Sequence, residues 1–312
     1  MHFHSAERIT AAVIAALFAV DLGLVAAGRF AVDWPAYAAV LSIGFCALAL
    51  GQFYRRVRPN ERIALATTAT GLFILLTIAG SIFCYLLLPV GGRSIDMTLI
   101  AVDAMLGYSW PDFVAAAAGV PFLGAVLAAV YMSSLTQMVV VIVALGFAGR
   151  SRQLHCFLLT GTFSALATIG IWAAVPSFGP SAIYPIAPEI ELAAGLVVNS
   201  AYGAELNRLA AEGAVLVSPK DGLGLIAFPS FHTVLACLAV WFSAGLRLFF
   251  PVFLAVNILM LPAILVHGGH HFVDLRGGFL VFALSLVAAR ALMRAPAGAV
   301  RGQIRTVQAD QA

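Results

Sequence analysis

Charged residues are scarce in this 312-residue chain, since only 10% are Asp, Glu, Lys or Arg, whereas 62% are hydrophobic. A soluble domain carries about a quarter charged residues. Here apolar residues run for about twenty positions at a time, which is enough to cross the ~30 Å hydrocarbon core of a bilayer. Regular alternation of polar and apolar residues is also missing, which argues against a membrane β-barrel. The composition therefore predicts an all-α fold, a polytopic transmembrane helical bundle.

Three further features are missing from the sequence, and their absence narrows the class of protein. No basic tract interleaved with aromatic residues suggests nucleic acid as a partner. The four cysteines lie inside apolar runs without metal-ligand spacing, so we interpret them as packing residues rather than as disulfides. No small-residue cleavage site follows the first apolar run, where Arg29 and Phe30 stand, so we expect this run to be retained as a span.

We predict about eight apolar spans within a single integral-membrane domain over residues 1–312. They are 9–28, 34–54, 63–88, 121–148, 154–175, 232–250, 252–266 and 274–292. The first three form an N-terminal part over 1–92, and 293–312 is expected to be a cytoplasmic tail whose last residues are disordered. Asp21 interrupts the first span. A carboxylate at mid-bilayer costs roughly 2.5–3.5 kcal/mol, so Asp21 is expected to face the bundle or to lie nearer an interface.

Two stretches do not have the pattern of a span. The first, 93–119, mixes aromatic and apolar residues with three aspartates (Asp96, Asp103 and Asp112). This mixture is typical of an amphipathic helix on the membrane surface, with a plain loop as the alternative. The second, 176–227, is hydrophilic; residues 190–212 are predicted to form one helix and 218–222 a turn.

The positions of lysine and arginine predict the orientation of the chain. With a cytoplasmic N-terminus, eight spans place 12 of these residues on the cytoplasmic side and 5 on the other. We therefore expect a protein of the bacterial inner-membrane type with both termini in the cytoplasm. The same topology brings the surface helix, the hydrophilic segment, His232, His270 and Asp274 together at the non-cytoplasmic end.

Two motifs at the ends of apolar runs contain ionisable groups. His270 and Asp274 are four residues apart, so they share one helix face. A carboxylate there can fix one imidazole nitrogen and leave the other nucleophilic. His232 begins another helix, whose free N–H groups suit a phosphate, and when protonated it can supply a proton to a leaving group. Ser230 is expected to cap that helix or to donate to phosphate. The set suits phosphoryl transfer through a phosphohistidine.

The segments Pro229-Ser230-Phe231-His232 and Gly269-His270-His271-Phe272-Val273-Asp274 resemble the second and third motifs of the type-2 phosphatidic acid phosphatase superfamily. The branch that they resemble most is that of the inositol phosphorylceramide synthases, which 96–110 and 176–180 also resemble. The resemblance implies a catalytic bundle over 93–292 with a six-helix phosphatase-type core.

The resemblance also implies roles for individual residues. His270 would be the nucleophile, Asp274 its orienting partner and His232 the general acid. His271 stands where an aromatic residue often occurs in the superfamily and is given no role. The substrate would be a lipid phosphate among membrane lipids, and neither a metal nor another cofactor would be required.

The chain departs from the superfamily pattern at the first motif, a lysine followed after six residues by Arg-Pro. Arg58-Pro59 has Gly51 at the lysine position and is predicted to lie on the cytoplasmic side. The Ser-Arg pair expected shortly before the nucleophile is replaced by Ala263 and Ile264. The positive charges that usually surround the phosphate are therefore missing from their usual places.

A pentavalent phosphorus still needs cationic or N–H donors. The candidates on the predicted side are Lys220, Arg276, Arg208 and Arg93. We select Lys220 and Arg276 as substrate-phosphate ligands, although Arg276 is two residues past Asp274 and so points away from that helix face.

The leading hypothesis is an integral-membrane lipid phosphatase or phosphotransferase. Its transfer variant moves an inositol-phosphate or similar head group to a polyol or sphingolipid acceptor. The sequence does not decide between hydrolysis and transfer. One alternative is a metal or haem site, because imidazoles with a carboxylate suit zinc or iron; its ligands would be His232, His267, His270, His271 and Asp274. Another is a transporter that binds a lipid phosphate without cleaving it.

Overall fold

The computed structural model describes residues 3–28, 31–220 and 222–294. In this part of the chain nearly all regular structure is helical, which confirms the predicted fold class. The α-helices are α1 (Ser5–Ala26), α2 (Trp34–Arg56), α3 (Glu61–Leu86), α4 (Asp96–Met105), α5 (Trp110–Ala118), α6 (Leu123–Met132), α7 (Ser134–Phe147), α8 (Ser151–Ala174), α9 (Pro188–Ala194), α10 (Ser200–Glu212), α11 (Phe231–Ser243), α12 (Phe250–His267) and α13 (Phe272–Arg294). A 3-10 turn, η1 (Pro180–Ala182), and two short parallel strands, β1 (Ala31–Val32) and β2 (Leu216–Val217), complete it. The tail predicted to be disordered, from 295 on, lies outside the described residues.

Six helices are long and apolar enough to cross a membrane, namely α1, α2, α3, α8, α12 and α13. A seventh span results if α5 and α6, which meet at 116°, are counted as one. The protein is therefore an integral-membrane helical bundle. The division into an N-terminal part and a catalytic bundle stays a prediction.

Two of the predicted spans were wrong in detail. The segment 121–148 is broken at Ser133, whose hydroxyl donates to the Val130 carbonyl at 2.6 Å, so that α6 and α7 are separate helices. The segment 232–250 contains only the 13 residues of α11. The helix ends at Ser243, and two residues further on the Gly245 carbonyl accepts a hydrogen bond from Arg150 at 2.6 Å.

The two polar stretches are also more divided than expected. The surface segment 93–119 forms two helices, α4 and α5, separated at Gly107, which has a φ of +76°. The single helix predicted over 190–212 was wrong, because Gly195 ends α9 in the left-handed conformation. The next helix, α10, starts after Asn199, whose side chain accepts the Tyr202 N–H.

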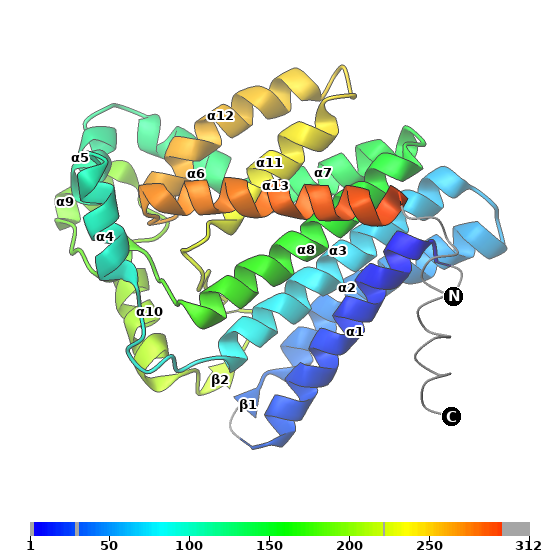
Figure 1. The fold of residues 1–312 in the computed structure, drawn as a ribbon, viewed down its shortest axis with the longest axis horizontal. Coiled ribbons are helices and arrows are strands. Elements are labelled where there is room, and N and C mark those ends of the chain that lie inside the picture. The colour runs from blue at the N-terminus through cyan, green and yellow to red at the C-terminus, as the bar shows by residue number, and fades with distance from the viewer. Residues whose placement is uncertain (1–2, 29–30, 221, 295–312) are drawn as a thin grey trace.

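The short helices α4, α5, α9 and α10 gather at one end of the long ones, whereas α1 begins and α13 ends at the opposite end (Figure 1). The start of α13, just after His270, lies against α4 at this end, because Asp103 accepts its first backbone N–H groups, and the His232 ring lies 6.3 Å from that of His270. The predicted convergence of these sequence-distant segments is thus present in the fold. Which end faces the cytoplasm stays a prediction.

The interior of the bundle is formed by α3 with α1, α2, α7 and α8 around it. At Gly51 of α2 a Cβ atom would clash with the Thr68 hydroxyl of α3, so this position stands where two helices approach closely, as small residues do in membrane bundles. Asp21 is 3% exposed and faces the bundle, the first of its two predicted environments. All four cysteines are free; Cys84 and Cys156 are buried packing residues, as predicted, whereas Cys46 is exposed.

Candidate active site

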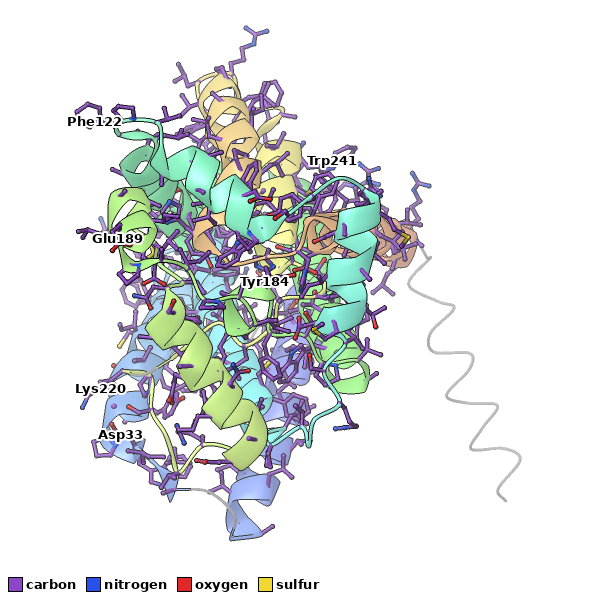
Figure 2. The ribbon with its side chains drawn as sticks, turned by 90° about the vertical axis from the view of Figure 1, so that its left-hand side faces the viewer. Asp33, Phe122, Tyr184, Glu189, Lys220 and Trp241 are labelled. Atoms are coloured by element: carbon purple, nitrogen blue, oxygen red, sulfur yellow. The ribbon has the colours of Figure 1, made fainter. Side chains whose placement is uncertain are left out.

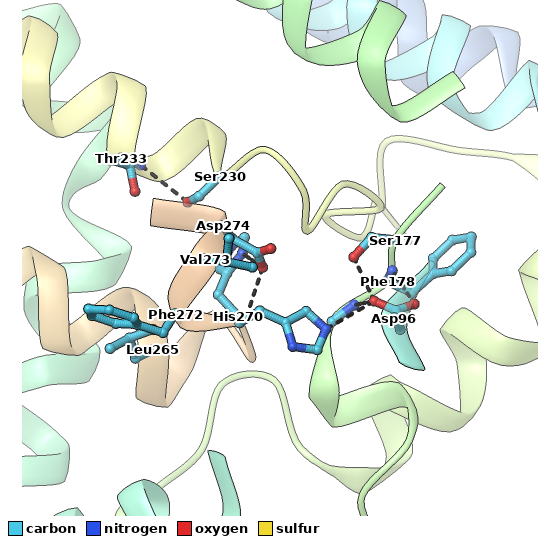
Figure 3. A network of polar contacts seen from close by, with 12 residues as sticks. Asp96, Ser177, Phe178, Ser230, Thr233, Leu265, His270, Phe272, Val273 and Asp274 are labelled. Carbon is cyan, nitrogen blue, oxygen red and sulfur yellow. Dashed lines mark hydrogen bonds and ion pairs between the residues drawn. The ribbon is translucent and has the colours of Figure 1, made fainter. Parts of the chain in front are cut away.

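His270 and Asp274 form a buried pair at the junction of α12 and α13. The His270 Nδ1 atom lies 3.0 Å from Asp274 Oδ2, and the same oxygen accepts the backbone N–H of His271 at 2.8 Å (Figure 3). A carboxylate beside Nδ1 keeps the proton on that nitrogen and leaves the lone pair on Nε2. The contact with Asp274 therefore favours the tautomer of His270 that a nitrogen nucleophile requires.

His232 lies close to this pair. Its ring centroid is 6.3 Å from that of His270, and the Tyr131 ring stacks on its face at 4.4 Å. Two imidazoles at this separation can contact a single phosphoryl group from two sides, each through one hydrogen-bond length. Tyr131 fixes the orientation of the His232 ring and was not identified from the sequence.

Ser230 is the N-cap of α11, one of its two predicted roles. Its side chain accepts the Thr233 N–H at 3.3 Å, and its own N–H donates to the Asp274 carbonyl at 3.1 Å, which joins the two motifs directly (Figure 3). In the described part of the chain, the backbone N–H groups of Phe231 and His232 have no acceptor. The start of α11 thus offers donors and a partial positive charge beside the histidines.

A second histidine–carboxylate cluster lies behind the first. His271 is 1% exposed; its Nε2 atom lies 3.1 Å from Asp96 Oδ1, and its Nδ1 atom lies 3.4 Å from Asp103 Oδ2. The two aspartates come from α4, the helix predicted to lie on the surface. The contacts of His271 with Asp96 and Asp103 were not predicted from the sequence, and His271 was assigned no role.

Both aspartates also bind backbone N–H groups. Asp103 accepts the N–H groups of Phe272 at 2.9 Å and Val273 at 3.0 Å, and so caps the start of α13. Asp96 accepts the Ser177 hydroxyl at 2.6 Å and two backbone N–H groups that follow it (Figure 3). The helix α4 is therefore fixed to both loops that surround His270.

Close contact between these two loops requires glycine. Gly179 has a φ of +88°, and a Cβ atom there would clash with the carbonyl oxygen of Gly269. Gly269 itself has a φ of +58°, in the left-handed region that favours glycine. Together they let the 177–179 loop lie against the turn that presents His270.

The hydrogen bonds of this cluster shift the pKa values of its members. Burial alone would lower the pKa of His271, but its contacts with Asp103 and Asp96 outweigh burial and raise the pKa from 6.5 to about 9. Burial would raise the pKa of Asp96, yet the hydrogen bonds from His271 and the other donors hold it below its usual range. At neutral pH the cluster therefore consists of an imidazolium between carboxylates.

This charge state predicts that stability depends on pH. Because the folded pKa of His271 is above its unfolded value, its contribution is complete below about pH 6.5 and is lost as the pH rises through about 9. The loss amounts to about 3 kcal/mol. We expect the Tm of the purified protein in detergent to fall between pH 6.5 and 9.5. A constant Tm over this window would show that His271 is not held in its charged form.

The two predicted phosphate ligands lie apart from the histidines. Lys220 has a 74% exposed side chain whose Nζ atom is 3.6 Å from Asp33 Oδ2, and both residues lie near the edge of this end of the bundle (Figure 2). Arg276 is exposed and lies over the Phe272 ring, 5.1 Å from its centroid. In the described part of the chain neither residue contacts His232 or His270, so their role in binding phosphate stays a prediction.

His232 also lines an apolar cavity of about 270 Å³ that extends into the bundle. Its walls come from α1, α3, α7, α8 and α11 and from residues 223–226.

Within the described residues, no group of three His, Cys, Asp or Glu side chains is placed to hold a metal ion. The site thus combines paired imidazoles, a helix N-terminus and a hydrophobic recess.

Comparison with known proteins identifies the class. A profile of the PAP2 superfamily, the type-2 phosphatidic acid phosphatases, matches residues 97–288, well over half of the chain. The chain therefore belongs to the PAP2 superfamily, whose members are phosphatase-type enzymes, and lipid phosphates are its general class of substrate. No curated protein and no solved structure matches the chain. The match does not resolve the branch, so the inositol phosphorylceramide synthase resemblance stays a prediction.

Proposed function

We propose that this protein cleaves a phosphoester of a membrane lipid through a phosphohistidine on His270, at the non-cytoplasmic face of the membrane. The proposal depends mainly on one observation. A buried imidazole with its Nδ1 atom held by Asp274 lies 6.3 Å, centroid to centroid, from the ring of His232, which lines an apolar cavity.

The chemistry has two steps. In the first, the Nε2 lone pair of His270 attacks phosphorus, the P–O bond to the lipid alcohol breaks, and protonated His232 gives its proton to the leaving oxygen. In the second, neutral His232 takes a proton from water, whose oxygen attacks phosphorus and releases phosphate from His270. An alcohol in place of water would give transfer of the phosphoryl or head-group phosphate to a polyol or sphingolipid.

Negative charge on the bound phosphate must be stabilised without the superfamily's first motif. The free N–H groups of Phe231 and His232 and the dipole of α11 supply donors on one side. An anionic phosphate between the rings also favours the charged form of His232, which is the form that the first step needs. Lys220 and Arg276 remain proposed ligands that would have to move toward the site.

The cavity beside His232 matches an acyl chain in length. It follows α3 from Phe73 to Tyr85 and α8 from Phe157 to Ile169, which is about 18 Å in each helix at 1.5 Å per residue. One leaflet of a ~30 Å hydrocarbon core has a similar depth. A lipid whose phosphate lies at His270 can therefore extend one chain into this cavity.

Filling the cavity predicts a change in chain-length preference. Ala165 lines it, and Ala165→Phe is expected to lower kcat/KM for a long-chain lipid phosphate at least about tenfold, because about two buried methylene contacts are lost. Activity toward a short-chain, water-soluble lipid phosphate should change little. Gly170→Phe is the matched control, since Gly170 is exposed on the same helix, outside the cavity lining. Equal losses on both substrates would contradict the assignment of the cavity.

The intermediate provides the direct test of the proposed function. Purified protein mixed with ³²P-labelled lipid phosphates and quenched in alkali should retain label that is released by acid, and the label should map to a peptide containing His270. Product analysis with and without added inositol or glycerol then distinguishes transfer from hydrolysis. Turnover without any histidine-linked phosphate would refute the covalent mechanism, and binding without turnover would favour the transporter alternative.

A further inference from the structure

The end of the bundle opposite the histidines contains a second, basic pocket. It has a volume of about 380 Å³ and lies where α8 begins and where α11 and α13 end (Figure 1). Arg152 of α8 and Arg290 and Arg294 of α13 line it, together with Trp241 of α11 and Met293. No acidic residue is part of its lining.

The three arginines have no anionic partner. In the described part of the chain none of them forms an ion pair with a carboxylate. The guanidinium of Arg290 is placed over the Trp241 ring, 4.9 Å from its centroid, a cation–π contact that orients the group. Like charges gathered around one pocket repel each other, so an anion bound between them would stabilise the arrangement.

The start of α8 adds to the positive potential. This 24-residue helix has no side-chain N-cap, so its first-turn N–H groups and positive dipole end are uncompensated beside Arg152. Guanidinium groups bind phosphate oxygens through paired N–H donors. The combination therefore suits an anion with several oxygens, such as a phosphate group, rather than a halide.

The surroundings indicate that this phosphate belongs to a lipid. Leu280, Leu284 and Val287 are each at least 60% exposed and lie along one face of α13 that leads to Arg294. Such a stripe offers an acyl chain a path along the helix to the pocket. The exposed Trp241 ring is of the type enriched at membrane interfaces, and basic pockets between transmembrane helices at the cytoplasmic side bind lipid head groups.

We propose that the pocket at Arg152, Arg290 and Arg294 binds the phosphate head group of an anionic phospholipid in the leaflet opposite the catalytic histidines. The site is separate from the active site and independent of the proposed reaction. It needs a head group with net negative charge, so phosphatidylglycerol is a suitable ligand, whereas phosphatidylcholine, whose choline cation neutralises its phosphate, is a poor one.

Binding to nanodiscs or mixed micelles tests this site. The purified full-length protein is titrated with phosphatidylglycerol, phosphatidylcholine or inorganic phosphate, and Kd is obtained by native mass spectrometry or from the rise in Tm. Phosphatidylglycerol should bind the wild type at least about tenfold more tightly than the double variant Arg290→Gln/Arg294→Gln, because two charge-assisted contacts are removed. The control, Arg58→Gln/Arg247→Gln, removes the same charge from exposed arginines outside the pocket at the same end and should retain wild-type affinity.

Each other outcome contradicts the proposal. Equal weakening in both double variants would mean that only the general positive charge of this end attracts the lipid. Protection by millimolar inorganic phosphate equal to that by phosphatidylglycerol would show a site for a free anion rather than for a lipid. If the Arg290→Gln/Arg294→Gln protein is unstable, Arg294→Gln alone serves, since Arg294 is exposed at the end of α13.

Discussion

Alanine in place of His270 is expected to lower turnover of a lipid phosphate by at least about 10⁴-fold and to abolish the acid-labile phosphoprotein. The reason is that, among the described residues, His270 is the imidazole that lies beside His232 with its Nδ1 atom next to a carboxylate. Its removal therefore leaves no nucleophile at this position. The measurement is the rate of phosphate release from a short-chain lipid phosphate, together with the labelling experiment on the same preparation.

His232→Ala provides the informative comparison. Loss of a general acid is expected to cost about 10²–10⁴-fold with a lipid alcohol as the leaving group. With p-nitrophenyl phosphate, whose leaving group needs no proton, the initial burst of p-nitrophenol should be affected much less, whereas steady-state turnover should stay slow and labelled protein should accumulate, because water has lost its base in the second step. His270→Ala should be inactive toward both substrates. Wild-type turnover by His270→Ala would remove His270 as the nucleophile.

Replacing His271 with leucine is expected to destabilise the protein by about 3–5 kcal/mol, since it leaves two buried carboxylates without their shared cation. Asp96 and Asp103 are only 2% and 3% exposed, so water cannot replace the lost imidazolium. The loss should be greatest at about pH 6.5, where the contribution of His271 is complete, and should shrink as the pH rises toward 9. Denaturant or thermal unfolding in detergent measures it.

His155→Leu is a suitable control for this prediction. His155 also lies beside a buried carboxylate, with its Nε2 atom 3.6 Å from Glu7, but Glu7 is bound in addition by Arg55. Its loss therefore leaves no carboxylate unpaired, and the expected cost is within about 1 kcal/mol. Equal destabilisation by both variants would show that His271 contributes no more to the stability of the fold than His155 does.

The sequence was sufficient where the relevant contacts are local. His270 and Asp274 are one helical turn apart, and Ser230 begins an apolar helix, so their pairing and capping followed from spacing alone. Most of the long spans were equally accessible, because about twenty apolar residues in a row predict a membrane-crossing helix. The runs 121–148 and 232–250 are the exceptions, since neither forms one long helix. The branch of the superfamily and the membrane sidedness are still predictions.

The features that could not be predicted from the sequence depend on contacts between segments that are far apart in the chain. His271 meets Asp96 across 175 positions, and no periodicity connects two residues so far apart. Beyond the end of α11 at Ser243, the Gly245 carbonyl accepts a hydrogen bond from Arg150, which is again a tertiary contact. Conversely, Lys220 was selected as a phosphate ligand because it is positively charged and was predicted to lie on the non-cytoplasmic side. In the fold its side chain lies beside Asp33 instead.

The walls of the cavity beside His232 include Thr10 of α1 and Phe73 and Thr77 of α3, although the superfamily match begins only at residue 97. Part of the wall that would select the lipid tail is thus encoded outside the superfamily match, whereas the rest, including Ala165, lies within it. Chimaeras that exchange the first three helices between relatives should acquire a new tail preference while keeping the same reaction. In evolution, such exchange would let one catalytic centre adapt to membranes of different fatty-acid composition.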